Sequence, residues 1–205
     1  MLLCDIGNTS YHFYNDKDDY REDVLCFNPL TCKERVYYIN VNSSVTPKIK
    51  NLDNWIDLSL YVKRENYYDT MGIDRIAACE AVENALIIDA GSAITVDIVK
   101  SGIFQGGFIT LGVEAMREAY KRVSNKLDYS FNFDIDLDKM PKNSRDAITY
   151  GFLAPLKAEV MRHNMPVILT GGNAKDLLGI FPEARVDELL LFHGMQKIIK
   201  KGRLC

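Results

Sequence analysis

Short runs of apolar residues, separated by polar turns, dominate the first part of the chain. Runs rich in β-branched, aromatic and aliphatic residues are typical of strands. The pattern predicts strands at Met1–Asp5, Tyr11–Tyr14, Val24–Phe27 and Val36–Val41. Between the second and third runs, Asn15–Asp19 predicts a solvated polar turn, because its acidic spacing fits no calcium-binding loop.

The strand pattern restarts in the second part of the chain and alternates there with helical periodicity. Apolar runs predict strands at Ala85–Ile88, Ala93–Val99, Gly102–Ile109 and Val167–Thr170. Apolar residues at steps of three and four predict helices after Asp74-Arg75 and over Val113–Leu127, Ser144–His163 and Leu189–Lys200. Ser144 is expected to cap its helix and Pro155 to kink or interrupt it. The polar stretch Tyr129–Lys142 predicts a loop.

The restart repeats a short motif. Leu3–Thr9 has the sequence LCDIGNT, and Ile87–Ala93 has the sequence IIDAGSA, so both place Asp-x-Gly directly after an apolar strand. Asp5 and Asp89 stand 84 residues apart, as do the two glycines that follow them. A repeat this coarse indicates a duplicated supersecondary unit rather than a solenoid. It predicts two related lobes, residues 1–82 and 83–205.

Composition and length narrow the class of protein. The 205 residues are 47% hydrophobic and 26% charged with a net charge of −3, which is typical of an ordered globular chain. This charge argues against nucleic-acid binding through a basic face. No apolar run approaches the roughly 18 residues of a membrane span, and the beginning of the chain lacks a signal-peptide pattern. We therefore expect a cytoplasmic protein that binds neither nucleic acid nor membrane.

The cysteine pattern agrees with a reducing compartment. The chain has five cysteines and no CxxC pair, and an odd number fits no closed disulfide framework. All five are expected to be structural: Cys4, Cys26, Cys32, Cys79 and Cys205. Cys4 and Cys79 lie among apolar neighbours and are expected in the core.

The repeated Asp-x-Gly motif suits a polyphosphate site. Asp and Gly are common turn residues, so one such motif would be structural. Two motifs carry more weight, because glycine lets the backbone approach a ligand and exposed N–H groups bind phosphate oxygens. A carboxylate beside phosphate needs a cation between them. Two such hairpins facing each other across a cleft would hold a nucleotide with its metal ion, although neither a P-loop nor GxGxxG occurs.

Six motifs in order give the chain a family resemblance. They are DIGNT (Asp5–Thr9), GIDR (Gly72–Arg75), DAGSAITVD (Asp89–Asp97), GGFITLG (Gly106–Gly112), NSRDAI (Asn143–Ile148) and TGG (Thr170–Gly172). The paired hairpins resemble those of the superfamily of actin, hexokinase and heat-shock chaperones. Within it, the whole set resembles type III pantothenate kinase. The resemblance implies an α/β fold, with a ribonuclease H-like fold duplicated as two lobes and mixed sheets flanked by helices.

The resemblance also implies the activity and its residues. The activity is ATP-dependent phosphorylation of pantothenate to 4'-phosphopantothenate, the first step of coenzyme A synthesis. The implied ATP-binding residues are Asp5, Ile6, Gly7, Asn8, Thr9, Ser10, Tyr11, His12 and Ser92. The implied substrate-binding residues are Tyr68, Gly72, Ile73, Asp74, Arg75 and Ser144, with Asp74 as the general base. Asp89 would bind the monovalent cation, potassium or ammonium, and magnesium would accompany ATP.

The residue chemistry of the GIDR motif suits these roles. A base in phosphoryl transfer needs to orient the hydroxyl and accept its proton late, which a desolvated Asp74 can do. Arg75 can bind the carboxylate of pantothenate through two hydrogen bonds, or it can pair with Asp74. Taken alone, the pair would be a helix N-cap followed by a surface charge.

Three departures from the family pattern affect the site. Ser92 replaces the usual threonine and keeps the hydroxyl, and Leu111 replaces the usual proline. The family's tyrosine ahead of Gly-x-Asp-Arg normally stands farther upstream, and here Tyr67 and Tyr68 both lie close to Gly72. We assign the substrate contact to Tyr68.

The fold leaves other functions open. One alternative is a transcriptional accessory or regulatory protein that keeps the fold without turnover. Another is a superfamily kinase for a sugar or a carboxylic acid, against which the Gly-x-Asp-Arg motif argues. Family members are homodimers whose substrate site is completed near the interface, and the resemblance implies the same here.

Overall fold

The computed structural model describes residues 1–204, which fold into two units. A five-stranded mixed sheet forms the centre of the first unit. Its strands, in sheet order, are β3 (Asp19–Asp23), β2 (Ser10–Tyr14), β1 (Leu2–Ile6), β4 (Val36–Asn40) and β5 (Trp55–Asp57). The strands β1, β2 and β3 form an antiparallel meander, whereas β4 pairs parallel with β1 and β5 pairs parallel with β4.

The second unit repeats this arrangement. Its five strands, in sheet order, are β10 (Arg185–Val186), β9 (Val167–Thr170), β6 (Ala85–Ala90), β7 (Ala93–Lys100) and β8 (Ile103–Leu111). Read from the other edge, this order matches the first sheet, with an antiparallel meander followed by two parallel strands. The repeated Asp-x-Gly motif thus belongs to a duplication of the whole sheet.

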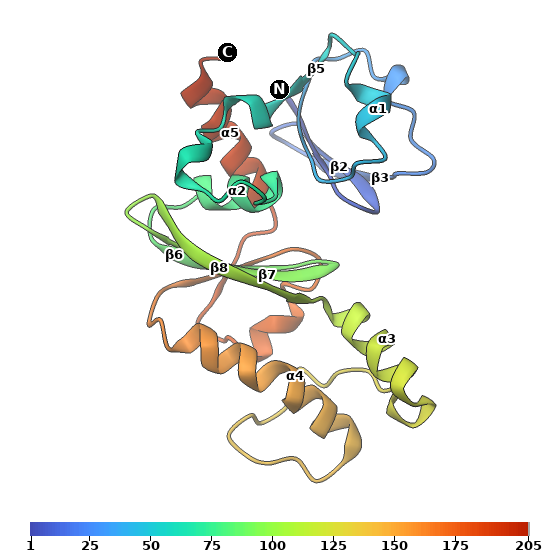
Figure 1. The fold of residues 1–205 in the computed structure, drawn as a ribbon, viewed down its shortest axis with the longest axis vertical. Coiled ribbons are helices and arrows are strands. Elements are labelled where there is room, and N and C mark those ends of the chain that lie inside the picture. Colours follow the sequence, from blue (N-terminus) through green and yellow to red (C-terminus); the bar gives the residue numbers. More distant parts are fainter. Residues whose placement is uncertain (205) are drawn as a thin grey trace. The chain divides into compact units, whose positions relative to one another are not determined.

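Five α-helices accompany the two sheets in the described chain (Figure 1). They are α1 (Thr46–Ile49), α2 (Ile73–Glu80), α3 (Val113–Val123), α4 (Ser144–Met161) and α5 (Leu190–Gly202). The chain divides between Val82 and Glu83, at the expected lobe boundary, and again between Glu188 and Leu189. Residues from Leu189 onward therefore group with the first unit, whereas the repeated motif predicts a single lobe over residues 83–205.

Contacts with α2 explain why α5 belongs to the first unit. The Lys197 ammonium donates to the Ala81 carbonyl at 2.9 Å. Gly194 lies so close to the Ala77 carbonyl that a Cβ there would overlap it. Such an approach needs glycine, because any side chain would hold the two helices apart.

Each sheet has its own hydrophobic core. In the first unit, one face of β1 and β2 buries Cys4, Ile6, Tyr11 and Phe13 against Trp55. In the second, the apolar sides of β6 and β7 pack on α4, mainly on Leu153, Leu156 and Val160. Cys4 and Cys79 are buried as expected, and burial raises the pKa of the Cys4 thiol. Cys205 lies outside the described residues.

Two local predictions are wrong, and one of the two effects expected of Pro155 does not occur. The third strand is β3 and not Val24–Phe27, because β3 is an exposed edge strand whose polar composition hides it from an apolar pattern. The cap of α4 is Asn143, whose side chain accepts from the Asp146 N–H at 2.9 Å, so Ser144 is the first helical residue. The sequence predicts a kink or a break at Pro155; α4 continues as one helix on both sides of this residue, so no break occurs.

Candidate active site

The first Asp-x-Gly motif forms the turn between β1 and β2. Asp5 lies opposite His12 in the ladder and Ile6 lies opposite Tyr11. The Gly7 N–H donates to the Ser10 carbonyl at 3.0 Å and closes the turn. Asn8 and Thr9, at its tip, are exposed. We call residues 7–10 the first hairpin loop.

Asn42, just after β4, contacts this loop from one side. Its side-chain amide donates to the carbonyls of Gly7 and Asn8, at 3.3 Å each. No sequence pattern marks this residue as functional, because an asparagine beyond a strand end is an ordinary turn residue. Only the parallel pairing of β4 with β1 brings it to the loop.

The side chains of the predicted ATP-binding segment do not all face solvent. Ile6 and Tyr11 are fully buried in the core of the first unit, so they can offer only backbone groups to a ligand. His12 is also buried, with its Nε2 at 2.7 Å from the Asp19 carboxylate and its ring packed on Phe192. Burial lowers the pKa of the His12 imidazole, and the hydrogen bond with Asp19 opposes this effect.

The second Asp-x-Gly motif turns β6 into β7 in the same way. Asp89 lies opposite Thr95, and the Gly91 N–H donates to the Ala93 carbonyl at 3.1 Å. Ser92 is exposed at the tip. The Gly112 N–H donates to the Ser92 carbonyl at 3.2 Å. Gly112 ends the GGFITLG motif, which explains why that motif and this hairpin occur together.

Asp89 has hydroxyl-bearing neighbours on both sides in the sheet. The register places Thr95 beside it on β7 and Thr170 beside it on β9. Gly171 then turns away with φ +85, and a Cβ there would overlap the Asp89 carboxylate. The TGG motif thus keeps the space at this carboxylate open.

Asp74 lies in the first turn of α2, directly after Ile73, in the first unit. Its Oδ1 accepts from the Arg75 N–H at 2.7 Å, and Gly72 leaves the space that the carboxylate occupies. Burial raises the pKa of Asp74, and the Arg75 N–H and guanidinium only partly offset this effect. Gly72, and not Asp74, occupies the N-cap position, and Arg75 is buried. The alternative of a capping residue followed by a surface charge is therefore wrong.

Tyr68 and Tyr67 have different partners. The Arg75 guanidinium donates to the Tyr68 hydroxyl and lies 5.7 Å from the centre of its ring. The Tyr67 hydroxyl instead donates to Glu80 at 3.0 Å, and Glu80 pairs with Lys201 of α5. Tyr68 is therefore in contact with the GIDR motif, whereas Tyr67 contacts Glu80, the residue that pairs α2 with α5.

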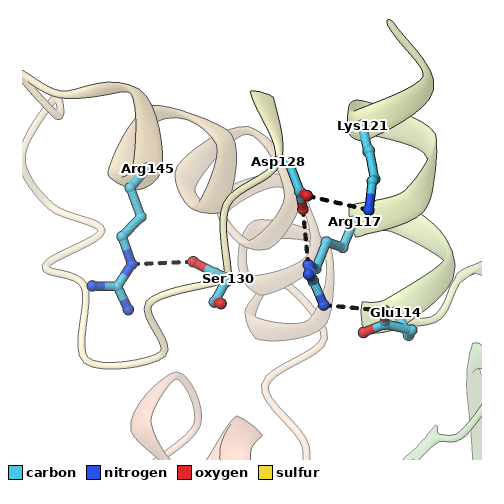
Figure 2. A network of polar contacts seen from close by, with 6 residues as sticks. All are labelled: Glu114, Arg117, Lys121, Asp128, Ser130 and Arg145. Carbon is cyan, nitrogen blue, oxygen red and sulfur yellow. Dashed lines mark hydrogen bonds and ion pairs between the residues drawn. The ribbon is translucent and has the colours of Figure 1, made fainter. Parts of the chain in front are cut away.

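Ser144 is exposed and begins α4. A polar network joins α3 to the loop that follows it (Figure 2). Arg117 binds Glu114 and Asp128, at 3.2 Å each, and Lys121 pairs with Asp128 at 3.3 Å. Arg145 donates to the Ser130 carbonyl at 3.1 Å. These contacts fix the segment that leads into the NSRDAI motif, and hydrogen bonding and charge from Lys121 and Arg117 lower the pKa of Asp128.

The two sheets have the same strand order, and each has an Asp-x-Gly hairpin between its first two strands, which is the duplicated α/β architecture that the family resemblance implies. A partly buried carboxylate with a raised pKa beside a buried arginine suits the class of ATP-dependent kinases. Residues 33–163 match the family model described as type III pantothenate kinase.

Full-length relatives agree with the family model. The chain is 60% identical over 205 residues to a type III pantothenate kinase of Sulfurimonas denitrificans, with 100% of both chains covered. It is 41% identical over 207 residues to that of Campylobacter hominis, again with 100% of both chains covered. The chain therefore belongs to the type III pantothenate kinase family and phosphorylates pantothenate with ATP in coenzyme A biosynthesis.

A solved structure from Campylobacter jejuni has the same fold. It is described as a conserved putative Baf family transcriptional activator, shares 36% sequence identity, and superposes with a TM-score of 0.90 over 100% of both chains. Among the described residues, no helix has the length and apolar character needed to cross a bilayer.

Proposed function

We propose that the first hairpin loop binds the phosphates of ATP and that Asp74 is the base for the pantothenate hydroxyl. The main support for this proposal is the position of Val41. Its N–H donates to the Ile6 carbonyl at 3.1 Å, and its side chain lies next to Gly72. One residue thus joins the base of the first hairpin to the GIDR motif within a single unit.

The transfer step needs little from the protein beyond positioning and charge. The pantothenate oxygen forms a bond to the γ-phosphorus, the bond from that phosphorus to the ADP oxygen breaks, and Asp74 takes the hydroxyl proton. Arg75 suits the pantothenate carboxylate, and its contact with Tyr68 favours Tyr68 over Tyr67 as the substrate tyrosine. Gly72, Ile73 and Ser144 complete the proposed substrate contacts.

Ser92 of the second hairpin is proposed to add a hydroxyl contact to ATP. Magnesium would accompany the nucleotide and neutralise phosphate charge. We also propose that Asp89 binds a monovalent cation. The residues fit such an ion, because a carboxylate with two neighbouring threonines and no Cβ at Gly171 offers oxygen donors and space.

Potassium dependence tests the role of Asp89. We expect ADP release with Mg-ATP to require pantothenate and to be stimulated by potassium or ammonium. In Asp89→Asn, which loses the charge but keeps the shape, we expect this stimulation to be lost. A second readout is the thermal shift that potassium causes without substrates, which should occur in the wild type only. Full wild-type activity without either cation would contradict the proposal.

The same assay separates the two candidate functions. The description of the Campylobacter jejuni structure favours a regulatory role as the second candidate. A regulatory protein that keeps only the fold would bind ATP but release no ADP in response to pantothenate. Because the reaction consumes ATP, we propose the cytoplasm as its location.

We further propose a homodimer with the substrate site near its interface. The edge strand β8 exposes Ile103, Ile109 and Leu111, and apolar residues on an open strand suit burial against a second copy. Light scattering at micromolar concentration is expected to give twice the chain mass. A monomer at that concentration would contradict the proposal.

A further inference from the structure

We propose that Asn42 is a positioning residue for ATP and sets the direction of the N–H groups in the first hairpin loop. The inference rests on the proposed phosphate-binding role of that loop. Asn42 belongs to none of the motifs that carry the family resemblance, and it reaches the loop only through the parallel pairing of β4 with β1.

The Asn42 side chain is buried, and both its amide nitrogen and its amide oxygen form hydrogen bonds. Its amide donates to the Gly7 and Asn8 carbonyls at 3.3 Å each. Its Oδ1 accepts from the Ser44 N–H at 3.0 Å and from the Ser44 hydroxyl at 2.7 Å. Its own N–H donates to Asn40 Oδ1 at 2.8 Å. These bonds fix the amide plane, so its N–H groups point at the loop.

Because of peptide geometry, the contact with Asn42 determines where the N–H groups of the first hairpin loop point. In a trans peptide the carbonyl and the N–H of the same unit point to opposite sides, and the described chain has no cis peptide bond. Because the Gly7 and Asn8 carbonyls point at Asn42, the N–H groups of Asn8 and Thr9 point away from it. Within the described chain neither of these N–H groups donates a hydrogen bond to the protein. Successive N–H groups on one side form a cradle for an anion.

In the second hairpin, a backbone N–H group takes the place of the Asn42 side-chain amide. There the Gly112 N–H donates to the Ser92 carbonyl at 3.2 Å, and the absence of a Cβ at Gly112 lets the two segments meet. Both hairpins therefore have a donor that fixes a loop carbonyl from outside the turn. In the first unit that donor is the side chain of Asn42, so it can be changed without altering the backbone.

Asn42→Asp is the test, because the shape is kept while the two N–H donors are replaced by an oxygen that the Gly7 and Asn8 carbonyls repel. We expect the KM for ATP to rise about tenfold or more, as for the loss of hydrogen bonds to buried polar groups. The KM for pantothenate should change less than twofold. The thermal shift caused by Mg-ATP alone should fall in parallel with the loss of ATP affinity.

Asn54→Asp is the matched control. The Asn54 amide also donates to two carbonyls, those of Cys32 and Glu34, at 3.0 and 2.8 Å. A comparable loss of melting temperature is expected in this variant, with an unchanged KM for ATP. Equal changes in the KM for ATP in both variants would overturn the positioning role. If Asn42→Asp does not fold, Asn42→Ser, which removes the reach of the amide without adding charge, is measured in the same way.

A hairpin variant separates failure of this inference from failure of the proposed function. A side chain at Gly7 is tolerated by the fold, since its Cβ would lie 3.7 Å from the Ser10 carbonyl, but valine there should obstruct phosphate. Loss of ATP affinity in Gly7→Val with an unchanged KM in Asn42→Asp overturns only the role of Asn42. Unchanged affinity in Gly7→Val removes the loop from phosphate binding and overturns both.

Discussion

Asp74→Asn is expected to lower pantothenate-dependent ADP release by about 10²- to 10⁴-fold, the usual contribution of a positioned base. The asparagine keeps an oxygen that can accept from the Arg75 N–H, so the local backbone should be preserved. It cannot take the proton of the substrate hydroxyl. Mg-ATP binding, measured by thermal shift, should stay unchanged.

The raised pKa of Asp74 adds an expectation for stability. Burial disfavours the charged carboxylate, so the native state holds this proton more tightly than the unfolded chain. The contribution of Asp74 to stability therefore falls as pH rises from the unfolded pKa through the raised folded pKa. At neutral pH, Asp74→Asn should be at least as stable as the wild type, because it removes a partly desolvated charge.

The raised pKa also sets the acid side of the rate profile. Turnover needs the ionised carboxylate, so activity should fall as pH drops through a pKa above the ordinary value for aspartate. The exposed Asp69, changed to asparagine, is the control and should alter neither the rate nor the profile. Undiminished turnover in Asp74→Asn would exclude Asp74 as the base.

Gly194→Ala is expected to be the most destabilising single-atom addition in the first unit. The new Cβ would overlap the Ala77 carbonyl, so α5 and α2 would have to separate. Overpacking of this kind costs about 1–3 kcal/mol, and more where backbone must move. Urea unfolding should show a lower midpoint. Enzyme activity should also fall, because α2 carries Asp74.

Gly151→Ala in α4 is the matched helical control. Its Cβ would meet only the Tyr120 hydroxyl, at an ordinary 3.7 Å. Alanine is the better helix former by about 1 kcal/mol, so this variant should be neutral or more stable than the wild type. Equal destabilisation in both variants would show that the close contact between α5 and α2 is not the cause.

Motif spacing identified the hairpins, but it could not identify the groups that support them. Asp5 and Asp89 follow apolar strands and precede glycine, which is a local pattern. Asn42 and Gly112 support the hairpin loops from other strands. Such contacts depend on which strands pair, and strand pairing leaves no short-range pattern.

The limits of a pattern of apolar residues are visible in β3 and α5. The strand β3 is exposed along its length and pairs only with β2, so it needs no apolar face. The helix α5 was expected from its periodicity, but its place in the first unit depends on the absence of a side chain at Gly194.

The sequence by itself determined the duplicated fold, the two Asp-x-Gly hairpins and the family, because these follow from local strand-turn patterns and from motif order. The tertiary structure alone decided that Arg75 is buried and Asp74 partly buried, that Tyr68 contacts Arg75, and that α5 packs on α2. The physical reason is that burial, and with it the raised pKa of Asp74, comes from segments distant in sequence that pack around a residue.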